Sequence, residues 1–277
     1  MKKKAENIVL SAVLILLGAA VISPVFFMYA KSVTSEGKLT PDFYKALFTD
    51  GGVYFFMFLR SMTAAAAVTI GQTFTAVAVG FLFGRFRFRG RIVLLLAYTV
   101  VLFLPYSATM LPNYMIIREM NLLNTQWSII LPAVFSPLGV IVMTIFAASV
   151  PDETIDAALL ETKKLSEILG YVIIPQVMPG IALTMVITFT EAWNMVEQPQ
   201  AMMENRLLHP LSVSLNSIFS GGSGNFAASF LYIIPPMLLL WSCRDSLRDG
   251  ILKNSDKASV SGQSKRVPSK GEKQWIS

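Results

Sequence analysis

The sequence predicts an all-α protein that crosses a membrane about six times. Hydrophobic residues make up 54% of its 277 residues and charged residues only 14%, whereas soluble domains carry about 25% charged residues. The hydrophobic residues are gathered into long stretches that lack Asp, Glu, Lys and Arg. The low charge and its uneven placement both indicate that lipid is the solvent for most of the chain.

Six stretches have the length that a membrane-spanning helix needs. That length is about 20 residues, because the hydrocarbon layer is about 30 Å thick and each helical residue adds about 1.5 Å. The stretches are Asn7–Ala30, Ser61–Gly84, Ile92–Ile117, one within Met120–Pro151, Ile168–Thr190 and Phe226–Cys243. The first exceeds the apolar region of a signal peptide, about 7–15 residues, and is interpreted as a retained helix.

Two sequence features bear on how these spans pack. Pro105 and Pro112 lie within the third stretch, where they either kink the helix or are tolerated, as prolines often are in membrane helices. Gly80 and Gly84 form a Gly-x-x-x-Gly pattern. This pattern either permits two helices to approach closely or occurs by chance in apolar sequence.

The basic residues predict the orientation, because Lys and Arg are enriched in cytoplasmic segments. Most of the 23 Lys and Arg residues fall on one side if the N-terminus is cytoplasmic. They lie at Lys2–Lys4, Arg85–Arg91, Lys163–Lys164 and Arg244–Lys273. Six spans then return the C-terminus to the cytoplasm. Residues 251–277 are rich in Ser, Lys and Gly, and we expect them to form a disordered cytoplasmic tail.

The composition also excludes several kinds of chemistry. Cys243 is the one cysteine and His209 the one histidine, so the chain lacks the ligands for a zinc site built from several His and Cys. Neither a Gly-x-Ser-x-Gly motif nor a phosphate-binding loop is present. We therefore expect no metal, no cofactor and no catalytic residue. If ATP drives this protein, another chain must bind it.

The segment Val150–Gly180 connects the fourth and fifth predicted spans and carries too many charges for hydrocarbon. Its apolar residues recur close to helical spacing, at Ile155, Leu159, Leu165, Ile168 and Leu169. Acidic residues after Pro151 are typical of a helix start. The pattern predicts a short amphipathic helix over 155–169 on the cytoplasmic face. Its apolar side has three possible contacts: the rest of this protein, the lipid surface or a groove on a partner.

This segment resembles the cytoplasmic signature loop of permeases from binding-protein-dependent ABC importers. In that family the loop reads Glu-Ala-Ala, two residues, Asp-Gly-Ala, and then a hydrophobic stretch that ends Leu-Pro-x-x-x-Pro-Gly. Asp156-Ala157-Ala158 stands at Glu-Ala-Ala, Glu161-Thr162-Lys163 at Asp-Gly-Ala, and Ile174-Pro175 and Pro179-Gly180 at the closing prolines, without a gap. The resemblance implies that Asp156, Ala157, Ala158, Glu161, Thr162, Lys163 and Pro175 belong to a coupling helix that docks on an ATPase subunit.

Two departures from the family pattern affect this loop. Thr162 replaces a glycine, a residue used where the backbone needs a positive φ or a close approach, which Thr tolerates poorly. We therefore expect a different turn here. Lys163 replaces an alanine and adds bulk and charge at the expected contact with the ATPase.

Other segments are similar to carbohydrate-type permeases such as the maltose G subunit. They are Leu122–Trp127 and Trp193-Asn194, and the likeness runs from about Phe55 to Gly250. It implies the type I importer permease fold, divided into an N-terminal helix and extracytoplasmic loop (1–54), a permease core (55–250) with the coupling loop (150–178), and the tail (251–277).

The resemblance also implies partners and a location. They are a second homologous permease subunit, an ATP-binding-cassette ATPase dimer, a substrate-binding protein outside the cytoplasm and the lipid of the bacterial cell membrane. No nucleic acid is expected. The implied function is translocation of a sugar or oligosaccharide.

Glu191, Trp193 and Asn194 are candidates to line the translocation path near the end of the fifth span. Sugar hydroxyls need polar partners, and the apolar faces of sugars stack on aromatic rings. An ionisable residue at membrane depth usually faces protein or water. The alternative is that Glu191 and Glu197 bracket the outer membrane interface in water.

Three other functions stay open. One is an ABC permease for a solute other than a sugar. Another is an ion-coupled secondary transporter, which would use intramembrane charges for coupling, and this chain has few. The third is an intramembrane enzyme, and no paired catalytic groups at membrane depth support it.

Overall fold

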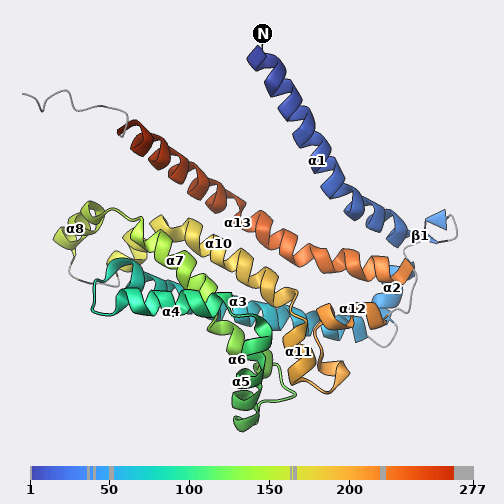
Figure 1. Ribbon diagram of the computed structural model, residues 1–277. Coiled ribbons are helices and arrows are strands. Elements are labelled where there is room, and N and C mark those ends of the chain that lie inside the picture. The colour runs from blue at the N-terminus through green and yellow to red at the C-terminus, as the bar shows by residue number, and fades with distance from the viewer. Residues whose placement is uncertain are drawn as a thin grey trace, which may run out of the picture. The chain divides into compact units, whose positions relative to one another are not determined.

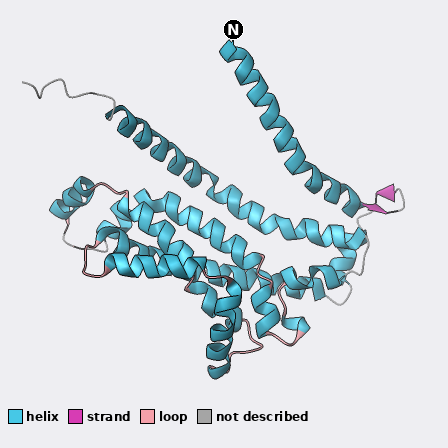
Figure 2. Ribbon diagram, in the orientation of Figure 1, coloured by secondary structure: helices cyan, strands magenta, loops and turns pink. Residues whose placement is uncertain are grey.

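The structure, a computed structural model, describes residues 2–35, 38–39, 42–49, 53–162, 164, 167–218 and 223–264. Nearly all of these residues are helical (Figure 2). Two strands of two residues each, β1 (Thr34–Ser35) and β2 (Lys38–Leu39), pair antiparallel directly after the first helix. The predicted all-α fold class is confirmed.

The helices follow one another along the chain in the order labelled in Figure 1. They are α1 (Lys2–Val33), α2 (Asp42–Thr49), α3 (Val53–Arg85), α4 (Arg91–Phe103), α5 (Tyr106–Glu119), α6 (Trp127–Val134), α7 (Pro137–Ala148), α8 (Asp152–Glu161), the π-helix η1 (Ile168–Ile173), α10 (Ile174–Trp193), α11 (Glu197–Met202), the 3-10 helix η2 (Arg206–Leu208), α12 (Leu211–Ile218) and α13 (Ser223–Ser264).

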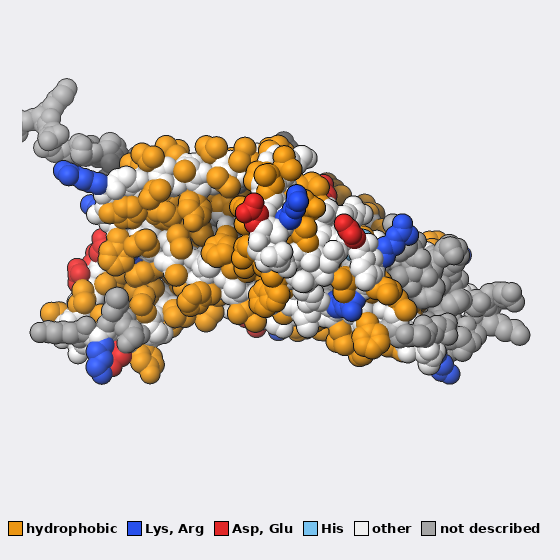
Figure 3. Space-filling model, turned by 90° about the horizontal axis from the view of Figure 1, so that it is seen from below, with side chains coloured by type: hydrophobic (Ala, Val, Ile, Leu, Met, Phe, Trp, Pro, Cys, Tyr) orange, Lys and Arg blue, Asp and Glu red, His pale blue; other side chains and the backbone are white. Residues whose placement is uncertain are grey.

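Five helical stretches in the described residues are long and apolar enough to cross a membrane. They are Val9–Val33, Val53–Arg85, Trp127–Ala148, Ile168–Trp193 and Asn225–Gly250. The pair α4 and α5 makes a sixth if a broken pair is counted as one span. Hydrophobic side chains cover much of the face shown in the space-filling view (Figure 3), as expected where lipid is the solvent.

The third predicted span, Ile92–Ile117, is not one helix. It breaks at Leu104 and Pro105, between α4 and α5. Proline lacks the backbone N–H and pushes the residue before it out of the helical conformation, and Pro105 itself is extended, with ψ of 143°. Pro112, in contrast, lies inside α5 without ending it. Of the two prolines, therefore, Pro105 alone interrupts the span.

The last helix, α13, continues farther than the sequence predicts. It extends to Ser264, whereas a disordered tail was expected from residue 251. The stretch from Ile251 to Ser264 contains no proline, so every residue has the N–H that helix extension requires. Residues 265–277 lie outside the described residues.

The chain divides into two compact units. Unit 1 comprises Met1–Gln72, Leu104–Phe135 and Thr188–Leu239, and unit 2 comprises Thr73–Phe103, Ser136–Ile187 and Leu240–Ser277. The helices α3, α10 and α13 each contribute one end to unit 1 and the other end to unit 2. These are packing units. The functional division into 1–54, 55–250 and 251–277 stays a prediction.

The core of unit 1 is built on the first half of α3. Tyr54 and Met57 pack against Leu211 of α12 and Ala227 and Ala228 of α13. The Tyr54 hydroxyl donates a hydrogen bond to the Ala228 carbonyl at 3.1 Å. A polar group that leaves water needs such a partner, so this bond fixes the register between α3 and α13.

The core of unit 2 depends on close contacts at glycines. A Cβ added at Gly80 would lie 2.5 Å from the Cβ of Met143, and one added at Gly84 would lie 2.6 Å from the Cβ of Ala147. The Gly-x-x-x-Gly pattern of α3 is thus a packing surface for α7, which confirms the close-packing interpretation. Gly180 of α10 faces the Phe146 ring in the same way.

Candidate functional site

The segment with the family signature begins with α8, a helix of 10 residues. Pro151 precedes it in an extended conformation, and Asp152 and Glu153 lie in its first turn, where the helix dipole favours negative charge. The predicted start of the helix is therefore confirmed. The predicted end at residue 169 is wrong, because the helix ends at Glu161.

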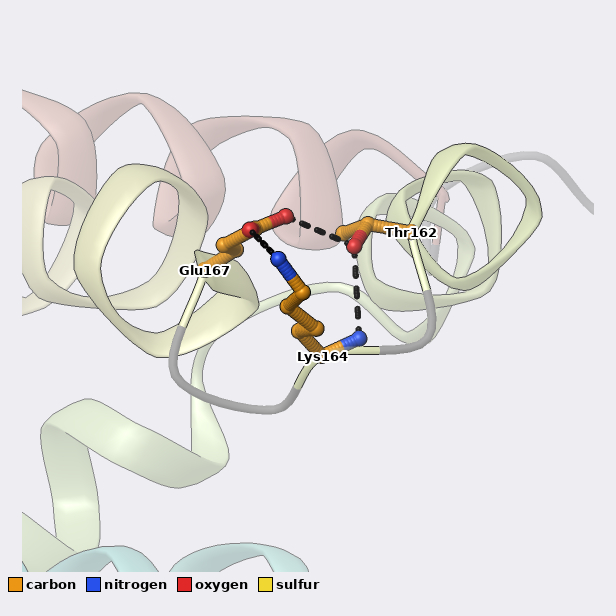
Figure 4. A network of polar contacts seen from close by, with 3 residues as sticks. All are labelled: Thr162, Lys164 and Glu167. Atoms are coloured by element: carbon orange, nitrogen blue, oxygen red, sulfur yellow. Dashed lines mark hydrogen bonds and ion pairs between the residues drawn. The ribbon is translucent and has the colours of Figure 1, made fainter.

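Thr162 ends the helix by leaving the helical conformation, with φ of −143° and ψ of 144°. Its hydroxyl accepts the backbone N–H of Lys164 at 3.2 Å and donates to Glu167 Oε2 at 2.7 Å. Figure 4 shows these side chains turned toward one another. Threonine hydroxyls that bond to nearby backbone compete with helix formation, which explains why periodicity alone extended the helix too far.

The backbone at Thr162 is also unstrained, although this position holds a glycine in the family pattern. A φ of −143° is ordinary for a β-branched residue. Among the described residues, positive φ angles occur at Asn121, Asn124 and Gly90. The turn here therefore needs a threonine hydroxyl instead of the conformational freedom of glycine.

Glu167 is held by the same turn. Its carboxylate accepts from the Thr162 hydroxyl and from Lys164 Nζ, the latter at 3.0 Å. These hydrogen bonds, first from Thr162 and then from Lys164, lower the pKa of Glu167 below its ordinary value. The carboxylate therefore stabilises the turn in its ionised form.

One side of α8 packs against other residues of unit 2, to which the helix itself belongs. Ala158 is buried, and half-buried Ile155 lies against a cluster that includes Ile168 and Ile173. The start of α8 is attached to the end of α3, because the Arg85 guanidinium donates to the Val150 carbonyl at 2.8 Å and pairs with Asp152. From the sequence, Arg85 was predicted only to mark the cytoplasmic side of the membrane. No feature of the sequence distinguishes it from Arg87, Arg89 and Arg91.

The other side of α8 is exposed. Asp156, Ala157 and Glu161 are exposed, and Leu160 keeps 90% of its surface accessible. Leu159, its neighbour in sequence, keeps 50% of its surface accessible, so two adjacent apolar side chains are exposed beside these charges. Thus the expected coupling residues separate into two sets: Ala158 packs inward, whereas Asp156, Ala157 and Glu161 face outward. Lys163 lies outside the described residues.

Pro175 follows at the start of α10, where it is exposed. It cannot donate the helical hydrogen bond to the carbonyl four residues earlier. The chain immediately before α10 forms the π-helix η1 over Ile168–Ile173. π-helical turns are rare and are often found at functional sites, so the signature prolines coincide with an unusual backbone.

The three candidate path residues lie in different environments. Glu191 and Asn194 are exposed, but Trp193 is only 1% exposed and packs among Phe58, Phe189 and Tyr232. Its indole N–H donates to the Tyr232 carbonyl at 3.1 Å, and the Tyr232 hydroxyl donates to the Trp193 carbonyl at 2.8 Å. Trp193 therefore holds α10 to α13 in unit 1. A path role stays a prediction, and in this structure it suits Glu191 and Asn194 alone.

The fold defines the class of protein. The chain resembles a chain of a bacterial ABC transporter involved in the import of the acidic polysaccharide alginate, with a TM-score of 0.72 at 17% identity, over 88% of this chain and 97% of that chain. It has the fold of an ABC importer permease, and its described residues include five helical stretches long and apolar enough to cross a membrane.

Three curated relatives are permeases of solute transport systems. The arabinooligosaccharides transport permease AraQ of Halalkalibacterium halodurans is 24% identical over 73% of this chain and 74% of its own length. The diacetylchitobiose uptake permease DasC of Streptomyces coelicolor is 24% identical over 83% and 88%. The sn-glycerol-3-phosphate permease UgpE of Salmonella typhi is 22% identical over 72% and 73%.

No protein-family model matches the chain. Its homologues are nevertheless permease subunits of transport systems for sugars and related solutes, so the resemblance inferred from the signature loop is confirmed. The narrower likeness to the maltose G subunit stays a prediction.

Proposed function

We propose that this chain is a permease subunit of an ATP-driven importer that takes up a sugar or oligosaccharide. A substrate-binding protein delivers the solute outside the cell, and a second permease subunit completes the pathway. The relatives support this proposal, because AraQ and DasC are named for oligosaccharide uptake. The chain itself performs no covalent chemistry, in keeping with relatives that are transport permeases.

The proposal that ATP hydrolysis is coupled through this chain rests on the exposed side of α8. We infer that Leu160, Asp156 and Glu161 dock in a groove on a separate ATPase subunit. Burying the exposed Leu160 side chain in such a groove removes apolar surface from water, which stabilises the docked state. The attachment of its start to Arg85 and the burial of its own Ala158 make α8 a rigid lever, which transmits closure of the ATPase dimer to α3 and α10.

The test of docking uses site-specific crosslinking in the assembled transporter. Cys243 is the one native cysteine, so a Cys243→Ser background allows single cysteines to be introduced. Leu160→Cys should crosslink to the ATPase subunit. Leu207→Cys, an equally conservative change at an exposed leucine of η2, is the control and should not. Failure of Leu160→Cys to crosslink in a transport-competent assembly would contradict the docking proposal.

A second candidate function is supported by one relative. UgpE is named for sn-glycerol-3-phosphate, which is an anionic polyol derivative and not a sugar. Transport assays with the purified assembly, comparing a neutral oligosaccharide with sn-glycerol 3-phosphate, separate the two candidates.

A further inference from the structure

Unit 1 contains a cavity that is distant in sequence from the coupling segment. It is an open pocket, lies where α5 and α11 meet and has a volume of about 300 Å³; Ser107, Glu197 and Gln200 on its wall are exposed. Its lining residues are Tyr106, Ser107, Met110, Glu197, Gln200 and Ala201. Ligand sites in proteins are usually about 300–1,000 Å³, so the cavity is at the small end of that range and suits one sugar ring.

The side chains around this cavity combine polar and apolar groups. Ser107 and Tyr106 supply hydroxyls, Gln200 an amide with donors and an acceptor, and Glu197 a carboxylate that accepts. Met110 and the Tyr106 ring supply apolar surface. A sugar ring presents hydroxyls around its edge and C–H groups on its faces, so it satisfies both kinds of surface at once.

Tyr106 gives a second, independent indication of a ligand. Its hydroxyl oxygen is buried and has no hydrogen-bond partner among the described residues. Buried polar groups are almost always hydrogen-bonded, and each exception calls for a specific explanation. A hydroxyl of a bound solute in the cavity would supply the missing partner.

The charge of the lining distinguishes between solutes. Glu197 is acidic, and none of the six lining residues is Lys or Arg. Phosphates and carboxylates are normally bound by Arg, Lys or clustered backbone N–H groups, and a neighbouring carboxylate repels them. The cavity therefore suits a neutral ligand.

We propose that this cavity binds one ring of a neutral sugar during its passage and that Glu197 disfavours anionic solutes. The inference rests on the proposed transport function and narrows its substrate to uncharged carbohydrates. It separates this chain from relatives named for anionic cargo, such as UgpE.

The first test measures transport by the full assembly in proteoliposomes. The probes are arabinotriose, diacetylchitobiose, sn-glycerol 3-phosphate and an alginate trisaccharide. We expect uptake of a neutral probe, with KM raised about tenfold by Tyr106→Phe, the effect of losing one buried hydrogen bond to substrate. Glu197→Gln should raise KM less, because Glu197 is exposed and the amide oxygen still accepts a hydrogen bond. Tyr114→Phe, on the same helix but outside the lining, should leave KM unchanged.

The second test needs no transport. In the Cys243→Ser background, Ser107→Cys should react with a thiosulfonate reagent. The neutral sugar identified in the first test should slow that reaction, whereas sn-glycerol 3-phosphate should not. Glu197→Lys should reverse the preference by admitting the anionic probe.

The outcomes distinguish the two proposals. If the assembly transports none of the probes, both the proposed function and this inference fail. If it transports a sugar but the cavity variants leave KM unchanged, or the sugar does not protect Ser107→Cys, only this inference fails. Preferred uptake of an anionic probe by the unaltered assembly would also overturn it.

Discussion

Two cavities, one in each unit, differ in the chemistry of their walls. The cavity in unit 1 has polar groups on Tyr106, Ser107, Glu197 and Gln200. The cavity in unit 2 has a volume of about 220 Å³ and a wholly apolar lining. Unit 2 also carries α8, the helix proposed to receive the force of ATP hydrolysis. The comparison teaches that the two units differ in what their cavities can contact: the cavity of unit 1 presents polar side chains, as the proposed solute site requires, and the cavity of unit 2 presents apolar side chains alone.

The largest expected effect tests the packing of unit 1. Trp193→Ala removes a fully buried indole and its hydrogen bond to Tyr232, so we expect a loss of about 3–5 kcal/mol of stability, the usual cost of such truncations. Trp127→Ala, at a 57% exposed tryptophan, should cost far less. Thermal unfolding of the purified assembly measures both, and equal losses would contradict the packing role of Trp193.

The next prediction tests the packing of unit 2. Gly80→Val places side-chain atoms where the Met143 side chain and backbone already lie, so we expect a loss of about 1–3 kcal/mol from overpacking. Gly18→Val, in α1, meets nothing within 4 Å and is the matched control. Thermal unfolding again provides the comparison. A Gly80 variant as stable as the Gly18 variant would show that α3 and α7 do not pack closely.

A smaller effect is expected at the attachment of α8. Arg85→Met removes the bonds to the Val150 carbonyl and Asp152. Because Asp152 is mostly exposed, its ion pair with Arg85 contributes little. Loss of the hydrogen bond to the Val150 carbonyl should weaken the attachment of α8 by about 1 kcal/mol. If this attachment transmits the motion, transport per ATP hydrolysed should fall about fivefold. Arg87→Met, at a neighbouring exposed arginine, should leave the ratio unchanged. The measurement is the ratio of the transport rate to the ATPase rate in each variant, and equal ratios in the two variants would contradict the attachment role of Arg85.

The smallest expected effect is a pH dependence of the turn after α8. The pKa of Glu167 is lowered in the folded protein, so its stabilising contribution is present above the ordinary pKa of the carboxyl and is lost as pH falls through the lowered value. Hydrogen exchange at the Lys164 amide, corrected for intrinsic rates, should rise over that acidic range. Thr162→Val, which removes the 2.7 Å bond to Glu167, should weaken this pH dependence, because the bond from Lys164 remains.

Most of the spans could be predicted from the sequence, because a helix that crosses hydrocarbon needs about 20 consecutive residues that are mostly apolar and uncharged. The stretch Ile168–Thr190 matches the observed span Ile168–Trp193, since each uncharged run is read directly from the residues. The signature from Asp156 to Gly180 likewise predicted the resemblance to permeases, since its residues lie in one continuous segment. The end of α8 was missed because Leu165 and Ile168 continue the helical period across a turn made by the Thr162 hydroxyl.

The residues of the sites were harder to predict. Trp193 was expected to face a passage but is buried, and Arg85 was read as an orientation signal but attaches α8. In a membrane helix the side facing lipid and the side facing protein are both apolar. Hydrophobicity therefore gives no indication of which residues pack inside, and the cavity between α5 and α11 has no contiguous motif.

Sequence alone determined that the chain is helical, that it spans the membrane several times and that its signature loop lies between two spans, because these properties follow from the solvation of local segments. Tertiary structure alone decided that Ala158 faces inward while Leu160 faces outward, and that Tyr106 and Glu197 line one cavity. Those facts depend on contacts between residues far apart in the chain, whose free energies local composition does not record.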